Sequence, residues 1–156
     1  MRYDSRLPRV LHVLLHLEQM DKPATSVILA QMLQTNSSMV RRTMGGLREA
    51  GYVTSTRGHG GGWTLARPLA DITLLDLYEA LDSPELFALG EARDMPACLM
   101  ERAANDAISS ALEAARVIFL DRLAKTTVAD LAADFEDRLD AHLADVRAQI
   151  YALEEE

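Results

Sequence analysis

The sequence has little cysteine and no long apolar run, and each shortage excludes a class of protein. One cysteine, Cys98, among 156 residues excludes an internal disulfide and any zinc or iron–sulfur site built from the cysteines of one chain. No stretch approaches the ~18 uninterrupted apolar residues of a membrane span, so we expect no membrane partner. The longest early apolar run is interrupted by His12 and His16, and no small-residue cleavage site follows it. We therefore predict no signal peptide and a cytoplasmic protein.

Charge divides the chain into two unlike halves. The formal net charge is -8, yet residues 1–68 carry nine basic and four acidic side chains, a net of +5. Residues 69–156 carry seven basic and twenty acidic side chains, a net of -13. Only Lys22 and Lys125 are lysines, and the planar guanidinium of the other basic residues, all arginines, suits bidentate contact with phosphate and guanine. We expect a basic half that binds a polyanion and an acidic half with a different task.

The spacing of apolar residues predicts a mostly α-helical protein. Aromatic residues make up only 5% of the chain, and alanine, leucine and arginine are abundant, which favours helices. Helical spacing predicts helices over about residues 5–19 and 26–33, and a tight turn at 35–38 leads into a third helix that Gly51 ends. The side chains expected to face the core from the second and third helices are Ile28, Leu29, Met32, Val40, Met44 and Leu47.

After Gly51 the apolar period changes to two. Residues 52–56 and 62–66 therefore predict two short strands, and Trp63 is expected to anchor the second by packing. The four glycines between residues 58 and 62 predict a hairpin tip that can adopt positive φ and approach another surface closely. Two helices joined by a tight turn and followed by a two-stranded wing indicate a winged helix-turn-helix domain.

The rest of the sequence predicts a linker and two long helices. Thr73 is expected to cap a short helix that ends near residue 81, and residues 97–124 contain neither glycine nor proline. We divide the chain into a winged helix-turn-helix DNA-binding domain over residues 1–82, a linker over 83–96, and a helical dimerisation and sensing region over 97–156.

The two long helices carry apolar stripes that need a partner. The first stripe predicts the dimer contact, because the compact half is too small to cover both helices, and a symmetric homodimer would do so. Thr127 is expected to cap the last helix, which carries a short heptad seam. The predicted dimer residues are Ile108, Leu112, Phe119 and Leu123, and the seam of the last helix consists of Leu139, Leu143, Val146, Ile150 and Leu153.

The third helix and the wing carry the side chains expected to bind double-stranded DNA. With its apolar positions inward, the third helix presents Arg41 and Arg42 to base edges, and a glycine-rich wing with Arg57 suits an adjacent minor groove. Gly45 and Gly46 each cost roughly 1 kcal/mol relative to alanine, which a close approach to another surface would justify. The predicted set is Thr25, Ser26, Ser37 and Arg57 for phosphates, Ser38, Arg41 and Arg42 for bases, and His59 and Gly60 in the wing.

Other interpretations of the same residues are open. The winged helix could be a scaffold for a protein-interaction module whose helical tail binds a partner; retention on heparin would distinguish the two. His12 and His16 are spaced to share a metal ion, but no further ligand is near in sequence, so we expect no metal site and partly buried or dimer-facing histidines. We expect no enzyme, because Cys98 has no evident histidine base.

Four segments together resemble one family of bacterial regulators. They are residues 40–42, 47–53, 57–67 and 72–78, which include the wing sequence Arg-Gly-His-Gly-Gly-Gly-Trp-Thr-Leu-Ala-Arg. The chain resembles the Rrf2 family of winged-helix transcription regulators, with the match covering roughly residues 1–125. The resemblance implies a homodimer held by the long helix after the wing, which binds pseudo-palindromic operators, usually as a repressor.

The resemblance also has implications for an iron–sulfur cluster and for the role of Cys98. Cluster-sensing members of the family ligate an iron–sulfur cluster with three cysteines, each separated by five residues. Cys98 matches the central cysteine, and Ala92 and Ala104 stand at the flanking positions, so we expect no family-type cluster and no other cofactor. Cys98 is then either a redox-sensing thiol near a helix start or a small packing residue. Some relatives respond through a thiol, a small-molecule inducer or a protein partner.

Overall fold

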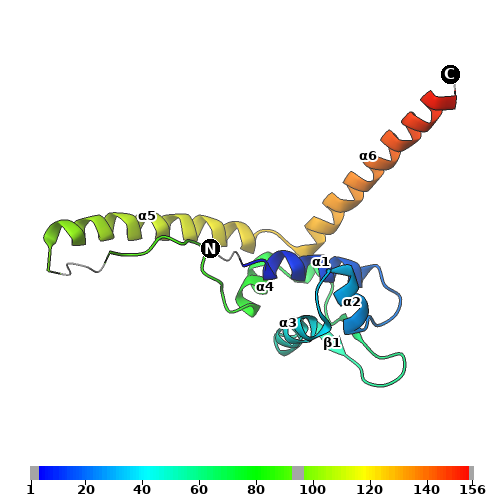
Figure 1. Cartoon of the computed structure of the whole chain (residues 1–156), viewed down its shortest axis with the longest axis horizontal. Helices are drawn as coiled ribbons and strands as arrows, with labels where there is room; N and C mark the ends of the chain where they lie inside the picture. Colours follow the sequence, from blue (N-terminus) through cyan, green and yellow to red (C-terminus); the bar gives the residue numbers. More distant parts are fainter. Residues whose placement is uncertain (1–3, 93–96, 155–156) are drawn as a thin grey trace.

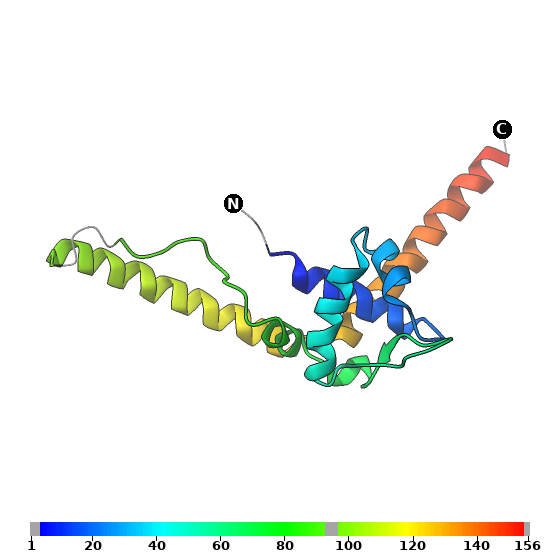
Figure 2. The ribbon, with the colours of Figure 1, turned by 60° about the horizontal axis from the view of Figure 1, so that its bottom comes forward.

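The structure, a computed structural model, describes residues 4–92 and 97–154. A compact body of short helices and one hairpin carries two long helices, which leave it in different directions (Figures 1 and 2). The prediction of a mostly α-helical winged helix-turn-helix is confirmed. The elements are α1 (Arg6–Glu18), α2 (Ser26–Met32), α3 (Ser37–Glu49), β1 (Val53–Ser55), β2 (Trp63–Leu65), the 3-10 helix η1 (Leu69–Asp71), α4 (Leu74–Ala80), α5 (Leu99–Ala124) and α6 (Val128–Glu154).

The core is built from the apolar faces of α1, α3 and α4, and it extends to the start of α6. Leu14, Leu47 and Leu77 are fully buried in it. Val128, in the first turn of α6, is also fully buried, and its N–H donates to the carbonyl of Ile72 at 2.8 Å. The core therefore includes residues from both sides of the predicted boundary at residue 82.

The helix-turn-helix forms as the sequence predicts, with one exception. Thr25 caps α2 and Asn36 caps α3. Each side chain accepts the backbone N–H of the residue three positions later, as cap side chains do. The predicted inner face of α3 is confirmed. The prediction for Ile28 is wrong, because α2 is only seven residues long and turns Leu29 and the following alanine inward. Ile28 lies on the outer side of α2 and is 40% exposed.

The wing is a two-stranded antiparallel hairpin held against the body at its base. Thr54 pairs with Thr64 at the centre of the hairpin. Each strand is one residue shorter at both ends than the sequence predicts. Trp63 is buried, and its indole Nε1–H donates to the Ser26 hydroxyl at 2.9 Å. Its backbone also exchanges two hydrogen bonds with Ala24. The prediction that Trp63 anchors the wing is confirmed.

Close packing at the wing base predicts a stability effect at Gly62. A Cβ there would lie 2.6 Å from the carbonyl oxygen of Ala24, which is backbone and cannot rotate away. We expect Gly62→Ala to lower the free energy of unfolding by roughly 1–3 kcal/mol, as overpacking does. The control is Gly90→Ala, where a Cβ meets nothing within 4 Å. Thermal unfolding followed by circular dichroism would measure both, and equal midpoints would contradict the packing argument.

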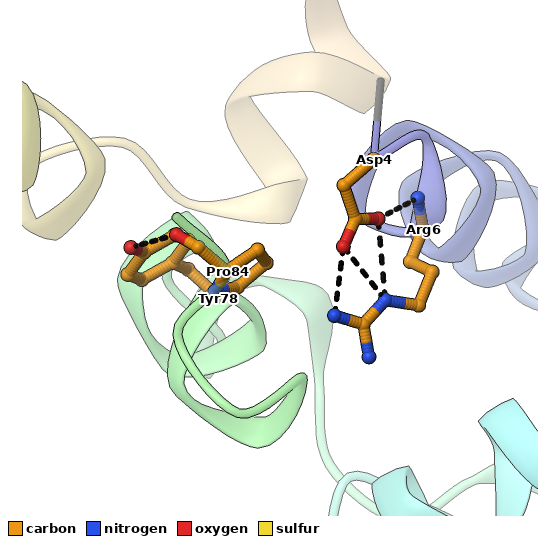
Figure 3. A network of polar contacts seen from close by, with 4 residues as sticks. All are labelled: Asp4, Arg6, Tyr78 and Pro84. Carbon is orange, nitrogen blue, oxygen red and sulfur yellow. Dashed lines mark hydrogen bonds and ion pairs between the residues drawn. The ribbon is translucent and has the colours of Figure 1, made fainter. Parts of the chain in front are cut away.

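The segment after α4 runs alongside α5 and is fixed to it. The Tyr78 hydroxyl donates to the carbonyl of Pro84 at 2.6 Å (Figure 3). The rings of Tyr78 and Phe119, a residue of α5, pack in a T-shaped arrangement. At the far end, the Asn105 side chain accepts the N–H of Ala92 at 3.0 Å and donates to its carbonyl at 2.8 Å. Residues 83–92 thus cover one side of α5, as Figures 1 and 2 show in green.

The caps predicted for α4 and α6 are confirmed. The Thr73 hydroxyl accepts the N–H of Asp76 and the Asp76 carboxylate accepts the N–H of Thr73, and Thr127 and Asp130 repeat this exchange. The side chains of Leu143, Val146, Ile150 and Leu153, part of the predicted seam of the last helix, lie outside the described part. Among the residues that the structure describes, no helix is both long enough and apolar enough to span a membrane.

Candidate nucleic-acid interface

The outer face of α3 presents the predicted base-reading residues. The helix is oriented by its buried face, and its start is fixed by Asn36, whose Oδ1 accepts the Met39 N–H at 2.8 Å. Ser38 and Arg41 are both exposed, one turn apart, and an Arg41 guanidinium nitrogen lies 3.4 Å from the Ser38 hydroxyl oxygen. Gly45 follows one turn later, and a Cβ there would meet nothing within 4 Å. Packing within this chain therefore does not require a glycine at position 45.

Arg42 is exposed on the other flank of the same helix face. With Arg9 of α1 it lines a surface hollow between α1, α3 and α4. Across residues 4–92 and 97–154, neither Arg41 nor Arg42 takes part in an ion pair. Their charges therefore stay available to an anionic ligand such as DNA.

Arg6 differs, because Asp4 neutralises it. The Asp4 carboxylate accepts the backbone N–H of Arg6 at 2.9 Å and contacts its guanidinium at 2.7 Å (Figure 3). Side-chain and backbone hydrogen bonds from Arg6 lower the pKa of Asp4, and the Asp4 carboxylate raises the pKa of Arg6. This pair fixes the start of α1 and adds no net positive charge to the face of α3.

The wing tip lies outside the body and carries Arg57, His59 and Gly60 exposed. Gly58 and Gly60 adopt φ of +95° and +76°, which side chains rarely adopt, so the glycines are required by the backbone of the turn. In Figure 2 the tip extends beyond β1 and β2 into open space. This prominent, basic tip is accessible to an anionic ligand.

Arg48 connects α3 to the wing, and the predicted DNA-binding set did not include it. One of its guanidinium nitrogens donates to the Ser55 hydroxyl at 3.3 Å, and the guanidinium lies 6.0 Å from the centroid of the Trp63 ring. The seven-residue spacing from Arg41 placed it on the outer face of the helix, but only the fold brings Ser55 and Trp63 to it. Arg48 of α3 thus contacts both strands of the wing, β1 through Ser55 and β2 through Trp63.

The three hydroxyl residues predicted for phosphate contact differ in availability. Thr25 is exposed at the start of α2, where its oxygen accepts the Ile28 N–H and leaves the hydroxyl hydrogen free to donate. Ser37 is half-buried at the first position of α3. Ser26 is half-buried and its oxygen already accepts the indole N–H of Trp63, so its first role is to fix the wing.

The residues at the family's cluster positions do not fit an iron–sulfur cluster. Cys98 is half-buried and forms the N-cap position of α5, and it is the chain's single thiol. The backbone of Ala92 is held by the amide of Asn105, and Ala104 offers no donor atom in its side chain. Within the described ranges, no three His, Cys, Asp or Glu side chains lie close enough to hold a metal ion together. One thiolate per chain is far from the four ligands that such clusters take.

Comparison with known proteins agrees with this geometry. A family model described as Rrf2, iron-dependent transcriptional regulator, matches residues 3–134. YwnA of Bacillus subtilis, described as an HTH-type transcriptional regulator, is 33% identical over 129 residues, which are 82% of this chain and 95% of YwnA.

Solved structures show the same arrangement. A protein from Lactobacillus plantarum, described as a transcriptional regulator, superposes with a TM-score of 0.71 and 26% identity, covering 90% of this chain and 97% of its own. IscR of T. potens superposes with a TM-score of 0.66 over 88% of this chain and 90% of its own. At 21% identity, the likeness to IscR shows the fold alone.

Proposed function

Since the chain belongs to the Rrf2 family of transcriptional regulators, we propose that it is a homodimeric repressor that binds a pseudo-palindromic DNA operator. The observation that carries the proposal is the exposed pair Arg41 and Arg42 on α3, which form no ion pair within the described residues, together with a wing tip that carries Arg57. Bases are read chiefly by Ser38, Arg41 and Arg42, and the wing enters the adjacent minor groove. The regulator acts where the bacterial chromosome is, in the cytoplasm, and its function involves no enzymatic step.

The proposed dimer forms through an exposed apolar stripe of α5, next to the side that residues 83–92 cover. Ile108 is 47% exposed and Ile118 is 71% exposed, although both are large and apolar. Such a stripe on a long helix is typical of a partner surface. Small alanines between the isoleucines allow two copies of α5 to approach closely. At spacings of four and three residues, the stripe consists of Ala104, Ile108, Ala111, Ala115 and Ile118.

This stripe is turned relative to the dimer seam expected from the sequence. Ile108 and Phe119 of that seam are exposed. Leu112 is half-buried in a hollow lined by residues 83–89, and Leu123 is only 7% exposed because its own chain covers it. Ile108 therefore remains in the proposed dimer contact, Phe119 lies beside the stripe with its ring against Tyr78, and Leu112 and Leu123 support the fold of the single chain.

Selection of bound fragments from a random DNA pool tests the proposed function. We expect a pseudo-palindromic site whose half-sites are centred about 34 Å apart or a longer whole number of turns, because the dimer's two recognition helices enter the same face of the duplex. Recovery of no preferred sequence, together with no retention on heparin, would favour the other function, a protein-interaction module with the winged helix as scaffold.

We expect no iron–sulfur cluster in the protein. Cys98 supplies one thiolate per chain, and Ala92 and Ala104 supply none. Protein purified without oxygen is expected to be colourless and to contain neither iron nor acid-labile sulfide. Iron and sulfide in whole-number ratio to the chain, with a visible absorption band, would contradict this expectation.

The signal is then a small-molecule inducer, a protein partner or oxidation of Cys98, and one experiment separates the last from the others. If the thiol is the sensor, peroxide weakens operator binding by the wild-type protein and leaves Cys98→Ser unaffected. Equal responses, or none, would leave Cys98 as a packing residue at the start of α5 and direct the search to inducers and partners.

A further inference from the structure

Two histidines on α1 bring their Nε2 atoms together in the groove beside α6. His12 and His16 are one helical turn apart, and their Nε2 atoms lie 2.9 Å from each other. Their ring centroids are 4.6 Å apart and the ring planes are tilted by 39°. Neither residue has a part in the proposed recognition of DNA, and the body does not bury either of them completely.

The two nitrogens share a hydrogen bond at 2.9 Å, and the same separation suits two ligands of one metal ion. Bonds from zinc to imidazole are about 2.0–2.1 Å long. Two such bonds at a right angle put the nitrogens about 2.9 Å apart, and at the tetrahedral angle about 3.4 Å apart. The observed 2.9 Å corresponds to the right-angle arrangement. Copper(II) and nickel(II) prefer this arrangement, and both accept imidazole nitrogen readily.

The surroundings of the pair combine apolar walls with acidic side chains. The pair lines a groove between α1 and α6, with Leu15 and Phe135 as apolar walls. The carboxylates of Glu18 and Glu136 line the same groove and make it favourable for a cation.

We infer that His12 and His16 form a binding site for a divalent transition-metal ion of the nickel or copper kind. The two Nε2 atoms are its protein ligands. Water fills the remaining positions, because no third His, Cys, Asp or Glu in the described part of the chain is near enough. The sequence-based expectation of no metal site was based on a missing third ligand, and the geometry of the pair shows that two converge without it. The bound ion would link adjacent turns of α1 beside α6.

The test is isothermal titration calorimetry, in which nickel(II) chloride is added to the metal-free, full-length protein. The chain has only four histidines, so two double variants form a matched pair. We expect wild type and His59→Ala/His142→Ala to bind one ion per chain. We expect His12→Ala/His16→Ala to raise the dissociation constant more than about tenfold, since each ligand contributes strongly. Cys98→Ser should bind as wild type does.

Thermal unfolding supplies the second measurement. Nickel should raise the unfolding temperature of the wild type and of the His59→Ala/His142→Ala variant, because it binds the two histidines only when α1 is folded. It should leave the His12/His16 variant unchanged, and His16→Gln, which keeps the size of the side chain, should behave the same way. Equal nickel affinity in the two double variants, or loss of binding only in the His59/His142 variant, would overturn the proposal.

Discussion

Replacing Ile108 by glutamate is expected to convert the protein to a monomer and to abolish tight operator binding. Ile108 lies in the exposed stripe on α5 and is expected to pack against the partner copy in the proposed dimer. A carboxylate there would be buried beside an apolar partner without a counter-charge, which costs several kcal/mol. Sedimentation velocity should show a monomer, and affinity should fall by orders of magnitude because one half-site binds weakly.

Val117→Glu is the matched control for this substitution. Val117 is 57% exposed, so its carboxylate would be at least as accessible to water as that of Ile108→Glu. Nine residues separate the two positions, which places them on opposite sides of the helix. The control protein should remain a dimer with normal operator affinity. A stable dimer from Ile108→Glu, or a monomer from Val117→Glu alone, would move the interface to another face.

Replacing Arg41, Arg42 and Arg57 together by alanine is the second change expected to have a large effect. A bidentate contact from arginine to guanine is worth about 1–3 kcal/mol, so each lost base contact weakens binding by roughly 5- to 150-fold. Arg41→Ala and Arg42→Ala should lose affinity for the selected operator most strongly. Arg57→Ala should weaken binding to most sequences and should reduce its dependence on salt, because it contacts the backbone or the minor groove.

Arg138→Ala is the control for the loss of positive charge. Arg138 lies on α6, paired with Asp134 at 2.7 Å, and α6 leaves the body away from α3 (Figure 1). Electrophoretic mobility shifts at two salt concentrations would compare the four single variants and the triple variant. A folded, dimeric triple variant with wild-type affinity for the operator would show that α3 and the wing are not the DNA-binding surface.

The parts of the fold that depend on local interactions were predictable from the sequence. A cap side chain and its partner are three residues apart, as in Thr73 and Asp76, so both can be read in one short stretch. The inner face of α3 follows from the helical spacing of Val40 and Met44. The wing follows from its alternating strands and glycines, because only glycine adopts the positive φ of the tip readily.

The parts that depend on distant residues were not predictable. Ile28 was expected inside, because spacing alone gives an apolar face and does not say which of two neighbouring faces meets α3. Residues 83–92 were expected to be a linker, and their attachment to α5 depends on Asn105, thirteen residues beyond Ala92. Arg48 similarly meets Ser55 and Trp63 only after the wing has folded back. The convergence of His12 and His16 depends on rotamers, which a four-residue spacing permits and does not require.

A small change of angle where α5 joins the body would displace the far end of this long helix by several ångströms. Leu123 is buried at the end of α5. A few residues later the Val128 N–H donates to the carbonyl of Ile72, and the Thr126 carbonyl accepts the N–H of Leu74, the first residue of α4. With 26 residues at 1.5 Å each, α5 is about 39 Å long. A tilt of about 5° at this joint would displace one end of α5 relative to the other by about 3.4 Å, the rise of one base pair. In the proposed dimer, an effector that changes this angle slightly would put α3 of one protomer out of register with its half-site. The effector would not have to contact the proposed DNA-binding surface of either protomer.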